Sequence, residues 1–312
     1  MSIPVNTDNF VRAETDRMFA DLQRESGGVN RFFHSRLPAA IDKQTVIRMN
    51  RDTLYSMAIV DISQGASFTI PDHGDRYLSV MVVNEDHYIN AIYHDAGEYT
   101  LTVDEHTTPY VALAVRILVD PTDDVDLAEV AAIQDGFQLD AASAREFEMP
   151  DYEETSFTRT RDAVLVLAGG LTNYDRAFGR PAGVEPIRHL LGTAAGWGGL
   201  PSVEATYIGA APTGSTTGYE LVVRDVPVDG FWSVSVYNAD GFFELNDRDA
   251  YTVNSVTAAR EADGSVVVHF GDGDAPNTIP TPEGWSYVVR LYRPRPEILD
   301  GTWTFPEATP AS

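Results

Sequence analysis

The densest group of chemically capable side chains lies early in the chain, where arginine, aspartate and tyrosine occur within a few positions. Its members are Arg48, Asn50, Arg51, Asp52, Thr53, Tyr55 and Ser56. Arginine forks bind carboxylates, and neighbouring cations keep an aspartate ionised as a general base. We predict that Asp52 acts as a base, that Arg51 stabilises an oxyanion and that Tyr55 positions the substrate, while Arg48 and Asn50 bind ligand. The same residue types also suit a buried salt-bridge network that anchors the first strand to the helical segment.

A second polar group is predicted on two strands near the C-terminus. Apolar and polar residues alternate in FWSVSVYN and WSYVVRLY, so one face of each strand is core and the other is polar. The residues expected on the polar face are Ser235, Tyr237, Asn238, Arg290 and Tyr292. They form either a concave surface that binds a small polar organic molecule or a ladder covered by the N-terminal domain or another subunit. In the first case, Arg290 and Tyr237 are alternatives for the oxyanion and positioning roles.

A glycine-rich segment from 192 to 201 brings two further candidates. His189 precedes this segment and can act as a base if the loop folds over a pocket; otherwise it caps the preceding helix turn. Trp197 anchors the loop, which is either a domain junction or a lid over a ligand. Neither GxxxxGK[ST] nor GxGxxG occurs, so the sequence does not indicate a phosphate-binding loop.

The remaining residue types argue against metal and cofactor chemistry. The chain has no cysteine, which removes thiolate nucleophiles and cysteine metal sites. Lys43 is the only lysine, and neither a GxSxG elbow nor an SxxK pattern is present. The spacing of His87 and His94 puts them on opposite faces of one strand, and His106 has no metal-binding motif around it. We expect no metal and no cofactor, and we expect these histidines to cap turns or pair with acids.

The charge of the chain bears on its partners. The 312 residues include 22 basic and 47 acidic ones, and the net charge of −25 repels nucleic acid. No stretch approaches the ~20 apolar residues of a membrane span. The first residues lack the pattern of a signal peptide. We therefore expect a cytoplasmic protein whose partner is a small organic molecule, with neither nucleic acid nor membrane involved.

Helices are expected in two parts of the chain. A capped first helix runs to about Glu25. The middle third holds a helix from 123 to about 140, a second from 157 to 171 and a short helical piece near 174–178. These helices separate two groups of short β-rich runs.

The β-rich runs, bounded by Gly, Pro and Asp turns, define the domain organisation. We predict an N-terminal helix and lead-in over 1–44, a β-sandwich over 45–120, a helical linker over 121–200 and a second sandwich or jelly roll over 201–312. The predicted fold class is mainly β with a helical middle segment.

Long motifs resemble a known bacterial family of paired domains of unknown function, numbered twelve fifty-four at the N-terminus and twelve fourteen at the C-terminus. The motifs are RMNRDTLYSMAIVDIS at 48–63, IPDHGDRYLSVMVVNEDHYINAIYHDAGEYTLT at 70–102, HLLGTAAGWGGLPSVEATY at 189–207, DGFWSVSVYNADGFFELN at 229–246 and GWSYVVRLYRPRPEILDGTWTFP at 284–306. The resemblance implies an immunoglobulin-like N-terminal sandwich, a jelly-roll-like C-terminal domain and a homo-oligomer. Leu200 departs from the family pattern, which has a polar residue after GWGG. Many relatives carry a leader peptide, whereas the first residues of this chain lack that pattern, so we do not expect the localisation of the family to apply to this chain.

Two functions are compatible with these residues. The first is a metal-independent hydrolase of a small ester, lactone or related compound, with Asp52 or His189 as base. The second is a noncatalytic protein that binds a small acid or assembles as an oligomer through its β-domains. The first predicts a pocket that holds a carboxylate with an environment-shifted pKa, whereas the second predicts that these groups are paired with one another.

Overall fold

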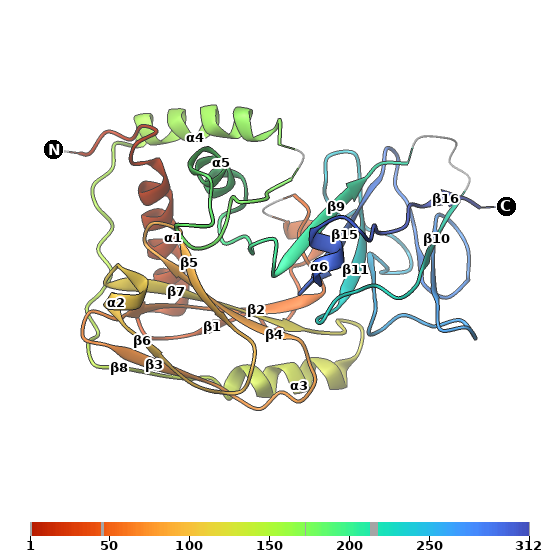
Figure 1. The fold of residues 1–312 in the computed structure, drawn as a ribbon, viewed down its shortest axis with the longest axis horizontal. Coiled ribbons are helices and arrows are strands. Elements are labelled where there is room, and N and C mark those ends of the chain that lie inside the picture. The colour runs from red at the N-terminus through yellow and green to blue at the C-terminus, as the bar shows by residue number, and fades with distance from the viewer. Residues whose placement is uncertain (1, 45–46, 172, 213–217, 312) are drawn as a thin grey trace. The chain divides into compact units, whose positions relative to one another are not determined.

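A computed structural model describes residues 2–44, 47–171, 173–212 and 218–311 (Figure 1). The described residues form sixteen strands in four sheets together with six α-helices, which confirms the predicted mainly β class. The chain divides into two compact units. The N-terminal unit comprises Met1–Arg36, Leu54–Val119 and Asp123–Ser202, and the C-terminal unit comprises Leu37–Thr53, Asp120–Thr122 and Val203–Ser312.

The N-terminal unit contains a β-sandwich of two sheets. The larger sheet has the order β1 (Phe33–His34), β2 (Thr53–Asp61), β7 (Tyr110–Leu118), β4 (Leu78–Asn84) and β5 (Ile89–Tyr93). The smaller sheet has the order β6 (Gly97–Leu101), β3 (Ala66–Ile70) and β8 (Gln138–Ala141). Strand β3 alternates between buried and half-buried residues, as expected of a strand with one face toward the core. Strand β4 is buried along its whole length, which explains why most of its residues are apolar.

Helices form a second core in this unit. Helices α1 (Phe10–Ser26), α4 (Glu154–Ala168) and α5 (Pro186–Gly196) share a cluster that includes Phe10, Val164 and Leu191, and Figure 1 shows them grouped together. Helix α3 (Asp124–Asp135) instead packs on the sandwich core through Val130. A short helix, α2 (Val103–His106), follows β6.

The glycine-rich segment after His189 begins as helix and not as the predicted loop. The sequence predicts a loop over 192–201, but α5 continues to Gly196. Glycine has low helix propensity, yet close packing favours it here, because a Cβ atom on Gly192 would lie 2.8 Å from Cβ of Ala177 and 3.0 Å from the Phe178 ring. The sequence also predicts a short helical piece near 174–178, but this stretch consists of turns and bends.

The C-terminal unit is a second sandwich. One sheet has the order β14 (Thr278–Ile279), β13 (Val266–Phe270), β10 (Tyr219–Val223) and β16 (Thr309–Pro310). The other has the order β12 (Thr252–Asn254), β11 (Trp232–Tyr237), β15 (Ser286–Tyr292) and β9 (Ala205–Ala210). A short helix, α6 (Pro296–Leu299), follows β15. Trp232, Val234 and Val236 point into the core between the sheets, as the alternation in FWSVSVYN predicts.

A segment from the first part of the sequence belongs to this second unit. Ile41 and Met49 pack beside Tyr237, Phe243 and Tyr251, on a cluster separate from the main sandwich core. The polar face of β11 and β15 is therefore covered by the chain's own segment 37–53.

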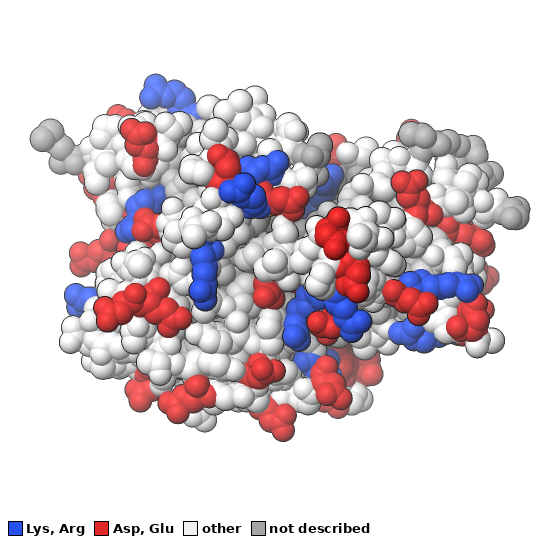
Figure 2. All heavy atoms as spheres, in the orientation of Figure 1, with Lys and Arg blue, Asp and Glu red and all other residues white. Residues whose placement is uncertain are grey.

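Two further observations concern the molecule as a whole. In the parts of the chain that the structure describes, no helix is long and apolar enough to cross a membrane. Acidic side chains are spread over the face shown in Figure 2 with basic side chains between them, in keeping with the net charge of −25.

Candidate functional site

A pocket in the N-terminal unit has a volume of about 490 Å³. Its lining residues are Arg12, Asp16, Glu85, Tyr110, Arg145, Glu146, Phe147, Glu148 and Pro150. They come from α1, from the turn after β4, from the start of β7 and from the segment before α4. None of them was among the residues predicted from the sequence to form a site.

Asp16 is the buried acid of this pocket. It lies on the inner face of α1 with 2% of its surface exposed. Tyr152 donates a hydrogen bond from its hydroxyl to Oδ2 of Asp16 over 2.7 Å. Among the described residues, Oδ1 of Asp16 has no hydrogen-bond partner although it is buried. Burial raises the pKa of Asp16 to about 6, against the opposing effects of Tyr152 and Arg12.

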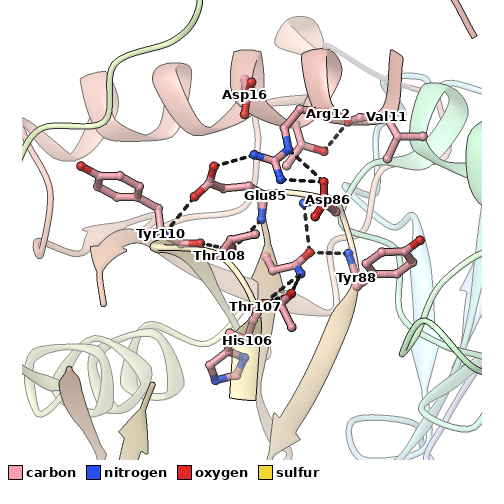
Figure 3. A network of polar contacts seen from close by, with 12 residues as sticks. Val11, Arg12, Asp16, Glu85, Asp86, Tyr88, His106, Thr107, Thr108 and Tyr110 are labelled. Carbon is pink, nitrogen blue, oxygen red and sulfur yellow. Dashed lines mark hydrogen bonds and ion pairs between the residues drawn. The ribbon is translucent and has the colours of Figure 1, made fainter. Parts of the chain in front are cut away.

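Arg12 also lines the pocket. It lies one helical turn before Asp16 on α1 (Figure 3). Its Nη1 donates to Oε2 of Glu85 over 2.8 Å, while Nε and Nη2 both donate to Oδ1 of Asp86 over 2.9 and 2.7 Å. Glu85 also accepts a bond from the backbone N–H of Tyr110 over 3.0 Å, and burial raises the pKa of Glu85. The guanidinium of Arg12 is thus held by two carboxylates.

Asp61, at the end of β2, holds another part of the pocket lining in place. Its Oδ2 accepts bonds from the Ser143 hydroxyl over 2.6 Å and from the Arg145 backbone N–H over 2.9 Å, and the Arg145 Nε lies 3.4 Å away. Burial alone would raise the pKa of Asp61, but these bonds and those from Ser63 hold it well below its usual range. Asp61 therefore pins the segment that presents Arg145, Glu146 and Phe147 to the pocket.

The turn between β4 and β5 carries Glu85 and Asp86 (Figure 3). Asn84, the last residue of β4, organises this turn. Oδ1 of Asn84 accepts bonds from the backbone N–H groups of Asp86 and Tyr88, and Nδ2 donates to the carbonyl of His106. The His106 ring is fully buried, and neither of its nitrogens has a hydrogen-bond partner among the described residues. Burial lowers the pKa of His106.

His189 and Trp197, both predicted to be functional, belong to one row of stacked rings. Tyr88 stacks on His189 at 4.8 Å, His189 on His87 at 5.5 Å and His87 on Trp197 at 5.3 Å between ring centroids. The nitrogens of His189 lie within hydrogen-bond distance of the carbonyls of Ala177 and Asp86, at 2.9 and 3.1 Å.

His87, at the centre of this row, was expected to cap a turn or pair with an acid. Instead the Gly198 backbone N–H donates to its Nε2, and its Nδ1 faces the hydroxyl of Thr193, which itself donates to the carbonyl of His189. This pattern assigns a neutral ring with the proton on Nδ1. Burial, with a smaller effect of His189, lowers the pKa of His87 far below its usual range.

Tyr55 also lies in the N-terminal unit, where the Arg116 guanidinium sits over its ring at 5.5 Å. Leu200, the departure from the family pattern, is buried in the same unit. Neither residue lines the pocket.

The other predicted residues meet in the C-terminal unit around Arg290. This buried guanidinium donates to the Ser235 and Tyr237 hydroxyls over 2.8 and 2.6 Å and to the carbonyls of Arg48 and Met49 over 2.9 and 3.1 Å. Burial works against its charge, but Tyr237, Tyr292 and Asp52 raise the pKa of Arg290 overall. The network ties segment 37–53 to the strands β11 and β15.

Asp52 and its sequence neighbours lie at the edge of this network. Asp52 is fully buried and accepts a bond from the Thr252 hydroxyl over 3.0 Å, whereas its Oδ2 has no partner among the described residues. Asn50 donates to the Tyr292 hydroxyl. Arg51 sits over the Tyr251 ring, and burial lowers the pKa of Arg51.

Asn238 organises the turn after β11, where its Oδ1 accepts bonds from the backbone N–H groups of Asp240 and Phe242.

Neither the N-terminal pocket nor a smaller one of about 270 Å³ near Trp232 is lined by Asp52, Asn238 or Arg290. The predicted residues of the C-terminal unit therefore cluster around Arg290 without lining either pocket.

Sequence reasoning missed Arg12 and Asp16 because it assigned no functional residue to the first helix. A weak signal was present, since a cation and a carboxylate four residues apart share one helix face. In the described parts of the chain, no group of three or more His, Cys, Asp or Glu could hold a metal ion.

Residues 29–100 match the family described as protein of unknown function DUF1254, and residues 204–296 match protein of unknown function DUF1214. The fold is similar to that of the VPA0106 protein from Vibrio parahaemolyticus, with a TM-score of 0.76 at 17% identity and coverage of 98% of both chains. An uncharacterized protein from Burkholderia cenocepacia is similar with a TM-score of 0.53 at 14% identity, covering 96% of this chain and 86% of that one. No curated protein matches the sequence.

Proposed function

The chain belongs to the family that pairs a DUF1254 domain with a DUF1214 domain, and since neither description names a reaction, we propose one from the N-terminal pocket. The protein is a metal-independent hydrolase of small esters or lactones, and Asp16 is its general base. The observation that carries this proposal is the carboxyl of Asp16, which lines a pocket of about 490 Å³ and whose buried Oδ1 has no hydrogen-bond partner among the described residues.

The environment of Asp16 suits proton transfer near neutral pH. A base works best when its pKa lies close to the operating pH, and burial raises the pKa of Asp16 to about 6. Tyr152 occupies one carboxyl oxygen, so Oδ1 is the atom available to take a proton.

In the proposed reaction, Asp16 both removes a proton from water and returns it to the leaving group, so a second acid–base residue is not needed. Ionised Asp16 accepts a proton from water on Oδ1 as the water oxygen bonds to the carbonyl carbon. The terminal guanidinium nitrogens of Arg145, which have no hydrogen-bond partner among the described residues, donate to the resulting oxyanion. When the intermediate collapses, the ester C–O bond breaks and Asp16 returns the proton to the leaving alkoxide. An acid and an alcohol result, or one hydroxy acid from a lactone.

The roles predicted for Asp52, Arg51, Tyr55 and His189 stay predictions. They are less well supported than the role of Asp16, because the two pockets have other linings and His189 has a carbonyl beside each ring nitrogen. Association into a homo-oligomer and a cytoplasmic location also stay predictions.

The test is hydrolysis of a panel of small esters and lactones in the presence of EDTA. Asp16→Asn should lower kcat/KM by about 10²-fold or more, the usual contribution of a general base. Asp21→Asn is the matched control, because Asp21 lies on the same helix and binds Arg17 and Arg24 instead of lining the pocket. The control should keep wild-type activity.

Three results would overturn the proposal. If Asp52→Asn abolishes turnover while Asp16→Asn does not, the reaction belongs to the C-terminal unit. If esters bind without turnover, the protein is the noncatalytic binding protein that the sequence analysis kept as its alternative. If activity depends on a metal that EDTA removes, the metal-independent chemistry is wrong.

A further inference from the structure

We propose that the pocket selects substrates that carry a positive charge, so that the substrate class is a small ester with an ammonium group. This inference rests on the proposed function and deepens it. The observation behind it is that the cations lining the pocket form ion pairs with carboxylates, whereas Asp16, Glu146 and Glu148 form no ion pair within the described residues.

The two arginines of the lining are neutralised within the protein. Arg12 binds Glu85 and Asp86. Arg145 binds Asp61, which is fully buried and makes further hydrogen bonds that favour its ionised form. Each ion pair therefore has little net charge to attract an anionic ligand from solution, although the terminal nitrogens of Arg145 still donate hydrogen bonds to an oxyanion that forms within the pocket.

Three acidic residues of the lining, in contrast to the arginines, form no ion pair within the described parts of the chain. Glu146 and Glu148 are exposed, and within the described parts of the chain neither forms an ion pair. Asp16 adds a buried carboxyl whose Oδ1 has no partner there. A buried ionised carboxylate without a partner is costly, and a ligand cation beside it supplies the missing charge.

The aromatic residues of the pocket favour the same class of ligand. Tyr110 and Phe147 line it and contact each other edge to face, with ring centroids 5.3 Å apart. The Tyr110 hydroxyl donates to the carbonyl of Glu146 over 3.1 Å, which fixes this ring in the wall. Aromatic faces attract alkylammonium groups through cation–π interactions, most strongly where water is excluded.

A bound cationic substrate would also favour the ionised form of Asp16, which is the form that acts as a base. The charged groups near Asp16 include Arg12 on its own helix and Glu85 and Asp86 on the β4–β5 turn, with Tyr152 as its hydrogen-bond donor. Their combined effect does not offset burial, so the acid is partly protonated near pH 6. An added cation favours the ionised form, and binding therefore releases a proton from Asp16.

The experiment compares two esters of the same shape, 2-(trimethylammonio)ethyl acetate and its neutral isostere 3,3-dimethylbutyl acetate. Binding is measured by calorimetry at low salt and pH 6, in buffers of different ionisation enthalpy. The cationic ester should bind about tenfold more tightly, with proton release. The double variant Glu146→Gln with Glu148→Gln should lose most of this preference, and Asp16→Asn should lose the proton release. The variant Asp21→Asn should keep both.

The outcomes separate this inference from the proposed function. If both esters bind and are hydrolysed equally, the charge preference is wrong and the hydrolase stands. If the cationic ester binds preferentially but neither ester is hydrolysed, the hydrolase is wrong and the charge preference stands. If the cationic ester does not bind at all, or if the double variant keeps the full preference, the inference is overturned.

Discussion

The hydroxyl of Tyr152 donates to one carboxyl oxygen of Asp16 over 2.7 Å, and the other oxygen of that carboxyl is buried without a hydrogen-bond partner among the described residues. The two residues are 136 positions apart in the sequence, so the bond joins α1 to the segment that leads into α4. The bond lowers the pKa of Asp16, while burial raises it by more.

Replacing Tyr152 by Phe removes the donor that favours the ionised form of Asp16. We expect the pKa of Asp16 to rise above its present value of about 6, because burial then acts with less opposition. The acid limb of the pH profile of kcat/KM should move to higher pH, with smaller change on the alkaline side. An acid limb that stays in place or moves to lower pH would show that Tyr152 does not tune this carboxyl.

Asp61→Asn should destabilise the N-terminal unit by about 2 kcal/mol at pH 7, because it removes charged hydrogen bonds to Ser143, Ser63 and Arg145. The pKa of Asp61 is lowered in the folded protein, so its contribution is present above the ordinary aspartate pKa of 3.8 and is lost as pH falls toward the folded value. The difference between the variant and wild type should therefore shrink below pH 4. Urea unfolding at pH 7 and pH 3 measures it. Asp140→Asn, an exposed residue on β8, is the control.

Arg290→Met should destabilise the C-terminal unit by about 3–5 kcal/mol, since it leaves the Ser235 and Tyr237 hydroxyls and two carbonyls without their donor. Arg290→Lys keeps the charge but cannot reach all these acceptors at once, so it should fall between wild type and the Met variant. Calorimetric unfolding distinguishes these cases. A Met variant as stable as wild type would mean that the network contributes specificity rather than stability.

His106→Leu should make the protein less sensitive to acid. Burial lowers the pKa of His106, so below the ordinary histidine pKa of 6.5 the unfolded chain binds a proton that the folded protein does not. Wild-type stability therefore falls as pH drops through this range, and the Leu variant lacks this contribution. We expect the variant to gain about 1 kcal/mol relative to wild type between pH 7 and pH 5. Parallel stability curves would contradict the assignment.

Periodicity predicted much of the fold because burial follows the alternation along each strand. Trp232, Val234 and Val236 lie in a sandwich core as their spacing indicates. Helix α5 could not be predicted in the same way, because its glycines are explained by the close approach of Ala177 and Phe178 rather than by helix propensity.

The candidate site was even harder to predict from the sequence than helix α5. Asp52 and Arg290 were each recognisable as chemically capable residues, but the sequence did not indicate that segment 37–53 covers the strands that carry Arg290. Asp16 became a candidate only through its burial, its long-range bond to Tyr152 and its unpaired oxygen. These are properties of tertiary packing, which residue type and spacing do not encode locally.

The most direct test of the account is the titration of Asp16 itself, which requires no substrate. Side-chain carboxyl ¹³C resonances followed by NMR from pH 3 to pH 8, in wild type and in Asp16→Asn, identify the group. We predict one aspartate that titrates with a pKa of about 6 and whose resonance is absent from the variant. If all aspartates titrate below about 4.5, or if the resonance near 6 persists in Asp16→Asn, Asp16 is not the base of this pocket.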